Sequence, residues 1–74
     1  MSAAKTIDVK GLDPARKHEM IFPSIEALKT GETARLIVEF NPKPLVVILK
    51  SQGKHEVAYE KEGPDEWVLR ITRI

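Results

Sequence analysis

The chain has 74 residues, no cysteine, and a formal net charge of +1 from 12 Lys and Arg against 11 Asp and Glu. This length predicts one domain, residues 1–74, with a small core. The missing cysteine excludes a disulfide scaffold, a thiolate metal site and a cysteine nucleophile. The balanced charge argues against a dedicated nucleic-acid binder.

The longest apolar run, Leu45 to Leu49, is too short to span a bilayer, and the start of the chain lacks the apolar core of a signal peptide. We therefore expect a cytoplasmic monomer without membrane association.

The first third of the chain predicts a strand followed by a helix. Residues 1–4 are expected to form a frayed tail, and Lys5 to Val9 alternates like a strand, with Ile7 and Val9 on one side. Asp13 has the chemistry of a helix N-cap, and Pro14 suits the first helical position because its missing N–H is not needed there.

Apolar residues at helical spacing extend this first helix from about Pro14 to Lys29, where Gly31 is expected to end it. Pro23 lies inside the helix and removes one backbone hydrogen bond. Because the apolar stripe continues in phase on both sides of Pro23, we expect a kink rather than a break.

The middle of the chain predicts a second strand and a second helix. The strand runs from Thr33 to Phe40, with one face formed by Ala34, Leu36, Val38 and Phe40. Asn41 is a second N-cap candidate, with Pro42 at the first helical position. The run from Leu45 to Leu49 is also compatible with a buried strand, but the cap, the early prolines, Lys50 and Gly53 favour a short helix.

The last third predicts an antiparallel hairpin. His55 to Lys61 and Trp67 to Arg73 alternate as strands, and a turn cluster from Gly63 to Glu66 separates them. The order βαβαββ places the first two strands parallel and lets both helices cover one face of a four-stranded mixed sheet. The sequence therefore predicts an α+β fold, a two-layer α/β sandwich with one open, polar sheet face.

Four segments carry a family resemblance. DVKGLDPARKH, Gly31–Glu32, NPKPL at residues 41–45 and GPDEWVLRITR at residues 63–73 resemble the family known as domain of unknown function 2249 over nearly the whole chain. That family in turn resembles the TusA/SirA sulfur-carrier fold, which implies a βαβαββ sandwich with sheet order 1-2-4-3. The domain of unknown function 2249 family has been seen together with redox and hemerythrin-like proteins, which implies a role near a redox system.

The chain departs from these relatives at two points. Sulfur carriers have a Cys-Pro pair at the start of the first helix, where the helix dipole lowers the thiol pKa. Asp13-Pro14 occupies that place here, and aspartate cannot hold a transferable sulfur atom, so sulfur relay is excluded. Many relatives also carry a histidine and acidic residues where this chain has Glu39, Phe40 and Asn41, so only His18 remains of a shared two-histidine site.

The candidate binding residues are Arg16, Lys17 and His18 in the first helix, together with Asn41 and Lys43 at the start of the second. Both helices follow strand carboxyl ends, so their starts meet at one edge of the sheet, where open α/β sheets bind ligands. We expect an acidic ligand or an unknown protein partner at this edge. Asp13, Pro14 and Pro42 are predicted to be structural caps.

The spacing of the residues gives less support to a metal site, a catalytic triad or a nucleic-acid surface. A metal site from His18, His55, Asp13 and Glu39 lacks the usual ligand spacing. Ser24 lies six residues from His18, on a different helix face, so a Ser–His–Asp triad with Asp13 is not formed. A basic patch on the open sheet face would draw on Arg35, Lys61, Arg70 and Arg73, and the scattered aromatics provide no stacking platform.

The function predicted is therefore a small, non-catalytic binding or partner module, accessory to a redox system and without a cofactor or bound metal. Two alternatives remain open: a histidine-based carrier of a metal or small ligand, and a weak RNA binder on the open sheet face.

Overall fold

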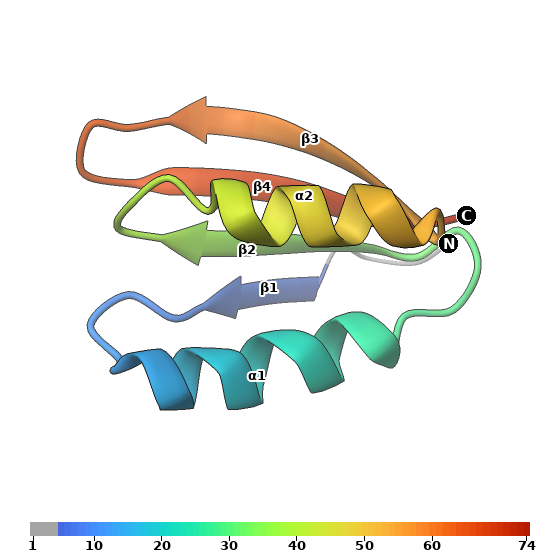
Figure 1. Cartoon of the computed structure of the whole chain (residues 1–74), viewed down its shortest axis with the longest axis horizontal. Helices are drawn as coiled ribbons and strands as arrows, with labels where there is room; N and C mark the ends of the chain where they lie inside the picture. The colour runs from blue at the N-terminus through green and yellow to red at the C-terminus, as the bar shows by residue number, and fades with distance from the viewer. Residues whose placement is uncertain (1–4) are drawn as a thin grey trace.

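The elements follow the predicted order in the computed structural model, which describes residues 5–74 (Figure 1). They are β1 (Lys5–Asp8), α1 (Pro14–Glu26), β2 (Thr33–Val38), α2 (Lys43–Gln52), β3 (His55–Glu62) and β4 (Trp67–Arg73). The tail predicted over residues 1–4 lies outside the described residues. The βαβαββ order of an α+β protein is confirmed.

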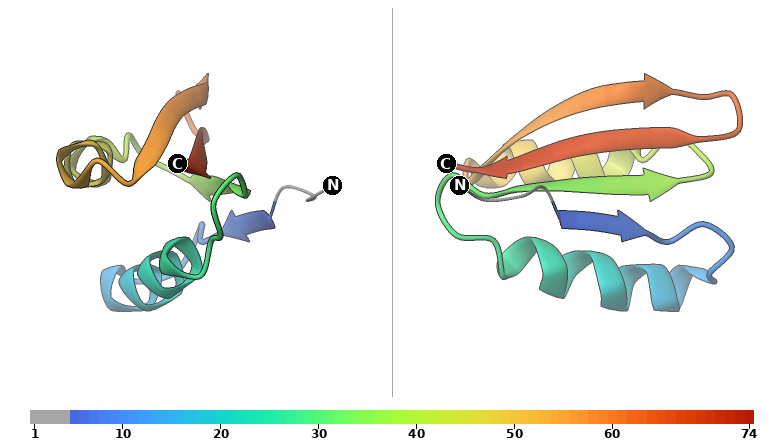
Figure 2. Two further views of the ribbon diagram at one scale, coloured as in Figure 1. Left: turned by 90° about the vertical axis from the view of Figure 1, so that its right-hand side faces the viewer. Right: turned by 180° about the vertical axis from the view of Figure 1, so that it is seen from behind.

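The sheet has the strand order β1-β2-β4-β3, as the resemblance implied. β1 and β2 are parallel, whereas β4 is antiparallel to both β2 and β3. Figure 2 shows both helices on the same side of the sheet, which leaves its other face open. The helix starts and the carboxyl ends of β1 and β2 therefore lie at the same end of the molecule (Figure 1).

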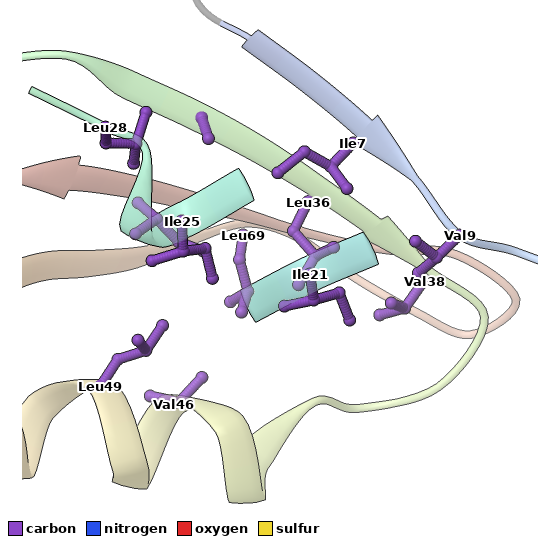
Figure 3. Close-up of a cluster of buried hydrophobic side chains, with 12 residues drawn as sticks. Ile7, Val9, Ile21, Ile25, Leu28, Leu36, Val38, Val46, Leu49 and Leu69 are labelled. Atoms are coloured by element: carbon purple, nitrogen blue, oxygen red, sulfur yellow. The ribbon is translucent and has the colours of Figure 1, made fainter. Parts of the chain in front are cut away.

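The core lies between the sheet and the two helices, because each strand alternates apolar and polar residues. Figure 3 shows Ile21 and Ile25 of α1, and Val46 and Leu49 of α2, directed toward the helix-covered side of the sheet. The buried apolar set is Ile7, Val9, Ile21, Ile25, Leu28, Ala34, Leu36, Val38, Val46, Leu49, Leu69 and Ile71. Apart from Phe40, the residues predicted to face inward from the four strands belong to this set or to its partly buried neighbours Val57, Tyr59 and Trp67.

The first helix begins as predicted and ends earlier. Asp13 is the N-cap, its Oδ1 accepts a hydrogen bond from the Arg16 amide at 2.9 Å, and Pro14 is the first helical residue. The helix continues through Pro23 without a break and ends at Glu26, not at Lys29.

Gly31 is not the residue that ends α1, contrary to the prediction. The C-cap is Ala27, in the ordinary right-handed conformation, and the Leu28 amide bonds to the Ile25 carbonyl at 3.1 Å. Gly31 has a φ of +87° and lies in the following turn, where its amide donates to the Arg73 carbonyl at 2.8 Å. This hydrogen bond connects the turn to the end of β4.

The second helix forms as predicted, but its predicted cap is wrong. Pro42 occupies the N-cap position, with φ −84° and ψ 40°, and α2 has no side-chain cap. Asn41 instead accepts a hydrogen bond from the Tyr59 hydroxyl at 2.8 Å. Gly53 ends the helix in the left-handed conformation, which confirms its predicted role.

Three strand ends differ slightly from the prediction. β1 ends at Asp8 rather than Val9, β2 at Val38 rather than Phe40, and β3 extends to Glu62. Val38 is the last ladder residue of β2; the Glu39 side chain beyond it binds the loop after β1, and Phe40 lies 53% exposed past the strand.

Candidate binding groove between the helix starts

The starts of α1 and α2 flank a groove of about 380 Å³ above the end of β2. Its volume lies in the range of small-ligand sites. Among residues 5–74 no acidic side chain lines it, and the charged or ionisable lining groups in this range are Lys17 and His18. The remaining lining residues are Pro14, Ile21, Phe22, Leu36, Val38, Phe40, Pro42, Pro44 and Leu45.

Each wall of the groove follows from a local feature of the sequence. The inward alternation of β2 places Leu36 and Val38 at the floor, whereas the apolar stripe of α1 supplies Ile21 on one wall. On the other wall, α2 starts with prolines, which lack an N–H and present carbon atoms instead of polar donors. The helix starts therefore form an apolar groove, where the sequence predicted a polar edge.

Glu39 connects three parts of the groove mouth. Its Oε2 accepts a hydrogen bond from the Gly11 amide at 2.7 Å, and its Oε1 forms a salt bridge with Lys17. The Lys17 ammonium also lies 4.5 Å from the centroid of the Phe40 ring, a cation–π contact. These contacts hold the β1–α1 loop, the first helix and the end of β2 in one arrangement.

The same contacts stabilise the ionised form of the Glu39 carboxyl group. The hydrogen bond from Gly11, followed by the Lys17 ammonium, lowers the pKa of Glu39 from 4.5 to about 2. Both partners favour the ionised carboxylate. Sequence reasoning named Glu39 as a metal-ligand candidate and as part of the segment where relatives carry a second histidine, and did not predict its contacts. The signal that could have indicated its role is the parallel pairing of β1 with β2, which brings the loop after Asp8 beside the residue after Val38.

The predicted binding residues are only partly brought together. His18 lines the groove, and its ring lies 4.4 Å from the Phe22 ring centroid at a tilt of 39°. Arg16 and Lys43 are exposed in the first turns of the two helices. We call Arg16, Lys17, His18 and Lys43 the basic rim. Asn41 does not line the groove, because its side chain is bonded to Tyr59.

The histidines lie at opposite ends of the helix layer. His55 begins β3, near the end of α2, and this residue is only 7% exposed. Within residues 5–74 no group of three or more His, Asp, Glu or Cys side chains is placed to hold a metal ion. Asp13 caps α1 rather than facing Ser24 and His18 as a triad member.

The predicted basic patch on the open sheet face is divided. Arg35 forms two hydrogen bonds of 2.8 Å with Glu60, and Lys61 pairs with Glu66 at 3.2 Å. Arg73 lies on the helix-covered side, on the same face of β4 as Leu69 and Ile71, which corrects its predicted place. Arg70 remains exposed on the open face.

No helix among residues 5–74 is long and apolar enough to cross a membrane.

Comparison with known proteins places the chain in a family. No curated protein and no solved structure matches the chain, so its likeness to the sulfur-carrier fold stays a prediction. The family model described as "Uncharacterized conserved protein (DUF2249)" matches residues 6–73. Because this match covers nearly all of the chain, the protein belongs to the DUF2249 family.

Proposed function

We propose that the protein is a non-catalytic binding module whose groove holds an amphipathic ligand with an anionic group. The observation that carries this proposal is the groove itself, which combines an apolar lining with two charged or ionisable groups from the described part of the chain, Lys17 and His18. Apolar surface in contact with water favours a ligand that covers it. An anionic group on that ligand would be complementary to the basic rim.

The state of Glu39 argues against a role of this carboxylate as a general acid or base. A general acid or base works best with a pKa near the operating pH. Glu39 is the carboxylate at the groove mouth, and its pKa of about 2 keeps it ionised. Its two oxygens are also already engaged by Gly11 and Lys17. The accessory role in a redox system rests on the family resemblance alone and remains a prediction.

A fluorescent amphipathic anion provides a direct test. 1-Anilinonaphthalene-8-sulfonate has an apolar ring system and a sulfonate, which are the two properties that the groove is proposed to recognise. We expect saturable, one-to-one binding with enhanced fluorescence. Chemical-shift changes should be concentrated at Lys17, His18, Phe22 and Leu45, which belong to the groove lining.

Two glutamate variants make a matched pair for this test. Phe40→Glu places a negative charge in the groove lining, whereas Val47→Glu places the same charge on α2 at a position outside the lining. Phe40 is 53% exposed and Val47 is 58% exposed, so neither change disturbs a buried side chain. We expect Phe40→Glu to weaken binding about tenfold or more and Val47→Glu to change it little.

Two results would contradict the proposal. One is an equal loss of affinity in both variants while circular dichroism shows both to be folded. The other is a set of shift changes confined to the open sheet face around Arg35 and Arg70, which would favour the RNA-binding alternative. Specific broadening of the His18 signal by a stoichiometric divalent metal would favour the metal-carrier alternative.

A further inference from the structure

We infer that the occupant of the groove is a short segment of a partner protein, with large apolar side chains next to Asp or Glu. This inference rests on the proposed function, because it uses the same groove. It adds the class of ligand and the parts of the surface beyond the groove that the ligand contacts.

The exposed apolar surface extends beyond the groove. Phe40 is 53% exposed at the mouth, and Ile48 is 42% exposed on α2. Ile48 lies three residues after Leu45 and four after Pro44, both groove residues, so it is their neighbour on the helix surface. A small molecule that fills about 380 Å³ would leave Ile48 in water. A peptide that lies along the groove covers Phe40, Leu45 and Ile48 together.

The arrangement of the helices suits a peptide. Figures 1 and 2 show α1 and α2 side by side over one sheet face, with their starts at the same end. An amphipathic helix placed in a groove between such elements uses apolar anchors three and four residues apart. Partly buried Phe22 and Leu45 belong to the two opposite helices, so such anchors would contact both walls.

The charge around the groove selects an acidic partner. Neither helix has an acidic residue in its first turn. Of the basic rim, Lys17 is paired with Glu39, whereas Arg16 and Lys43 form no salt bridge within residues 5–74. Complementary charges at the rim of an interface increase the association rate and determine orientation. Acidic residues of the partner segment are therefore expected over the helix starts.

Selection from a displayed library of random peptides tests this inference. Peptides of about 12 residues are long enough for three helical turns. We expect the enriched peptides to combine large apolar residues with Asp or Glu, and to displace 1-anilinonaphthalene-8-sulfonate from the groove. Fluorescence polarisation of a labelled, enriched peptide then measures affinity, association rate and salt dependence.

A pair of double variants separates rim charge from total charge. Arg16→Glu with Lys43→Glu reverses two charges at the helix starts, whereas Lys29→Glu with Lys54→Glu makes the same change in total charge at the opposite end of the helix layer. We expect the first pair to weaken peptide binding about tenfold at low salt, mainly through slower association, and less at high salt. The double variant Lys29→Glu with Lys54→Glu should bind the peptide with an affinity close to that of the wild type.

The possible failures are distinguishable. If the sulfonate dye binds in the groove but no acidic, apolar peptide is enriched or competes with it, the peptide inference is wrong and the proposed function stands. Enrichment of basic peptides, or equal effects of the two double variants, also overturns the inference. Dimerisation in analytical ultracentrifugation with the groove buried would identify a second copy as the occupant instead. If the dye does not bind in the groove, the proposed function itself fails.

Discussion

Removal of the Asp13 side chain is expected to destabilise the domain measurably. Its Oδ1 accepts the Arg16 amide at 2.9 Å, and its backbone carbonyl accepts the Lys17 amide at 2.9 Å. Asp13→Ala removes the first bond and keeps the second. Loss of an N-cap typically costs about 1 kcal/mol. In a domain of this size, that corresponds to a fall in melting temperature of roughly 4–8 °C.

Asn41→Ala is the matched comparison, because sequence rules predict the same cap at both residues. In the structure, Asn41 accepts the hydroxyl of Tyr59 and no helix amide. Because Asn41 is exposed, water can replace this hydrogen bond. We therefore expect Asn41→Ala to lower the melting temperature by less than half as much as Asp13→Ala does. Asp13→Asn keeps an acceptor at the cap and should retain most of the stability.

Thermal melting followed by circular dichroism at neutral pH measures these differences, and amide hydrogen exchange locates them. In Asp13→Ala the Arg16 amide should exchange faster, whereas binding of the anionic dye should survive because Asp13 does not line the groove. Equal falls in melting temperature for Asp13→Ala and Asn41→Ala, or unchanged exchange at Arg16, would refute the reasoning. Lost dye binding with unchanged melting would make Asp13 a functional residue.

Three further predictions concern acid stability, a buried histidine and a turn. Gly11 and Lys17 lower the pKa of Glu39 from 4.5 to about 2, so its contribution to stability is present above pH 4.5 and disappears as pH falls toward 2. The difference in melting temperature between wild type and Glu39→Gln should therefore shrink over this window, and a constant difference would contradict it. Burial, with Arg73 and Lys54 nearby, lowers the pKa of His55 below 6.5, so the unfolded chain binds the proton more readily. Melting temperature should consequently fall as pH drops below 6.5, and this slope should be shallower in His55→Gln; an identical slope would exclude His55 as its cause. Gly63→Ala would place a Cβ 2.9 Å from Trp67 Cζ2 at a φ of +62°, whereas Gly53→Ala, at +69°, meets no atom within 4 Å. Both should destabilise through backbone strain of about 1–2 kcal/mol, but only Gly63→Ala should shift the emission of the single tryptophan.

The features that the sequence determined by itself depend on short-range chemistry. The period of two from Trp67 to Arg73 predicts the bounds of β4 correctly, because one sheet face is buried and the other is not. Asp13, Pro14 and Gly53 mark helix ends through contacts or conformations within a few residues of themselves. These signals suffice for the order of the elements and, apart from Phe40, for the inward face of each strand.

The tertiary structure decided the features that depend on residues distant in the sequence. Asn41 has the side-chain chemistry of a helix cap. Its Oδ1, however, accepts a hydrogen bond from the hydroxyl of Tyr59, which β3 brings beside it. Glu39 binds Gly11 and Lys17 only because β1 and β2 pair in parallel. The groove has walls from α1, the segment after β2 and the start of α2, with β2 as its floor, so no contiguous pattern predicts it. The basic residues are visible in the sequence, whereas the apolar groove beside them depends on the separation of two helices over one sheet, which is a property of packing.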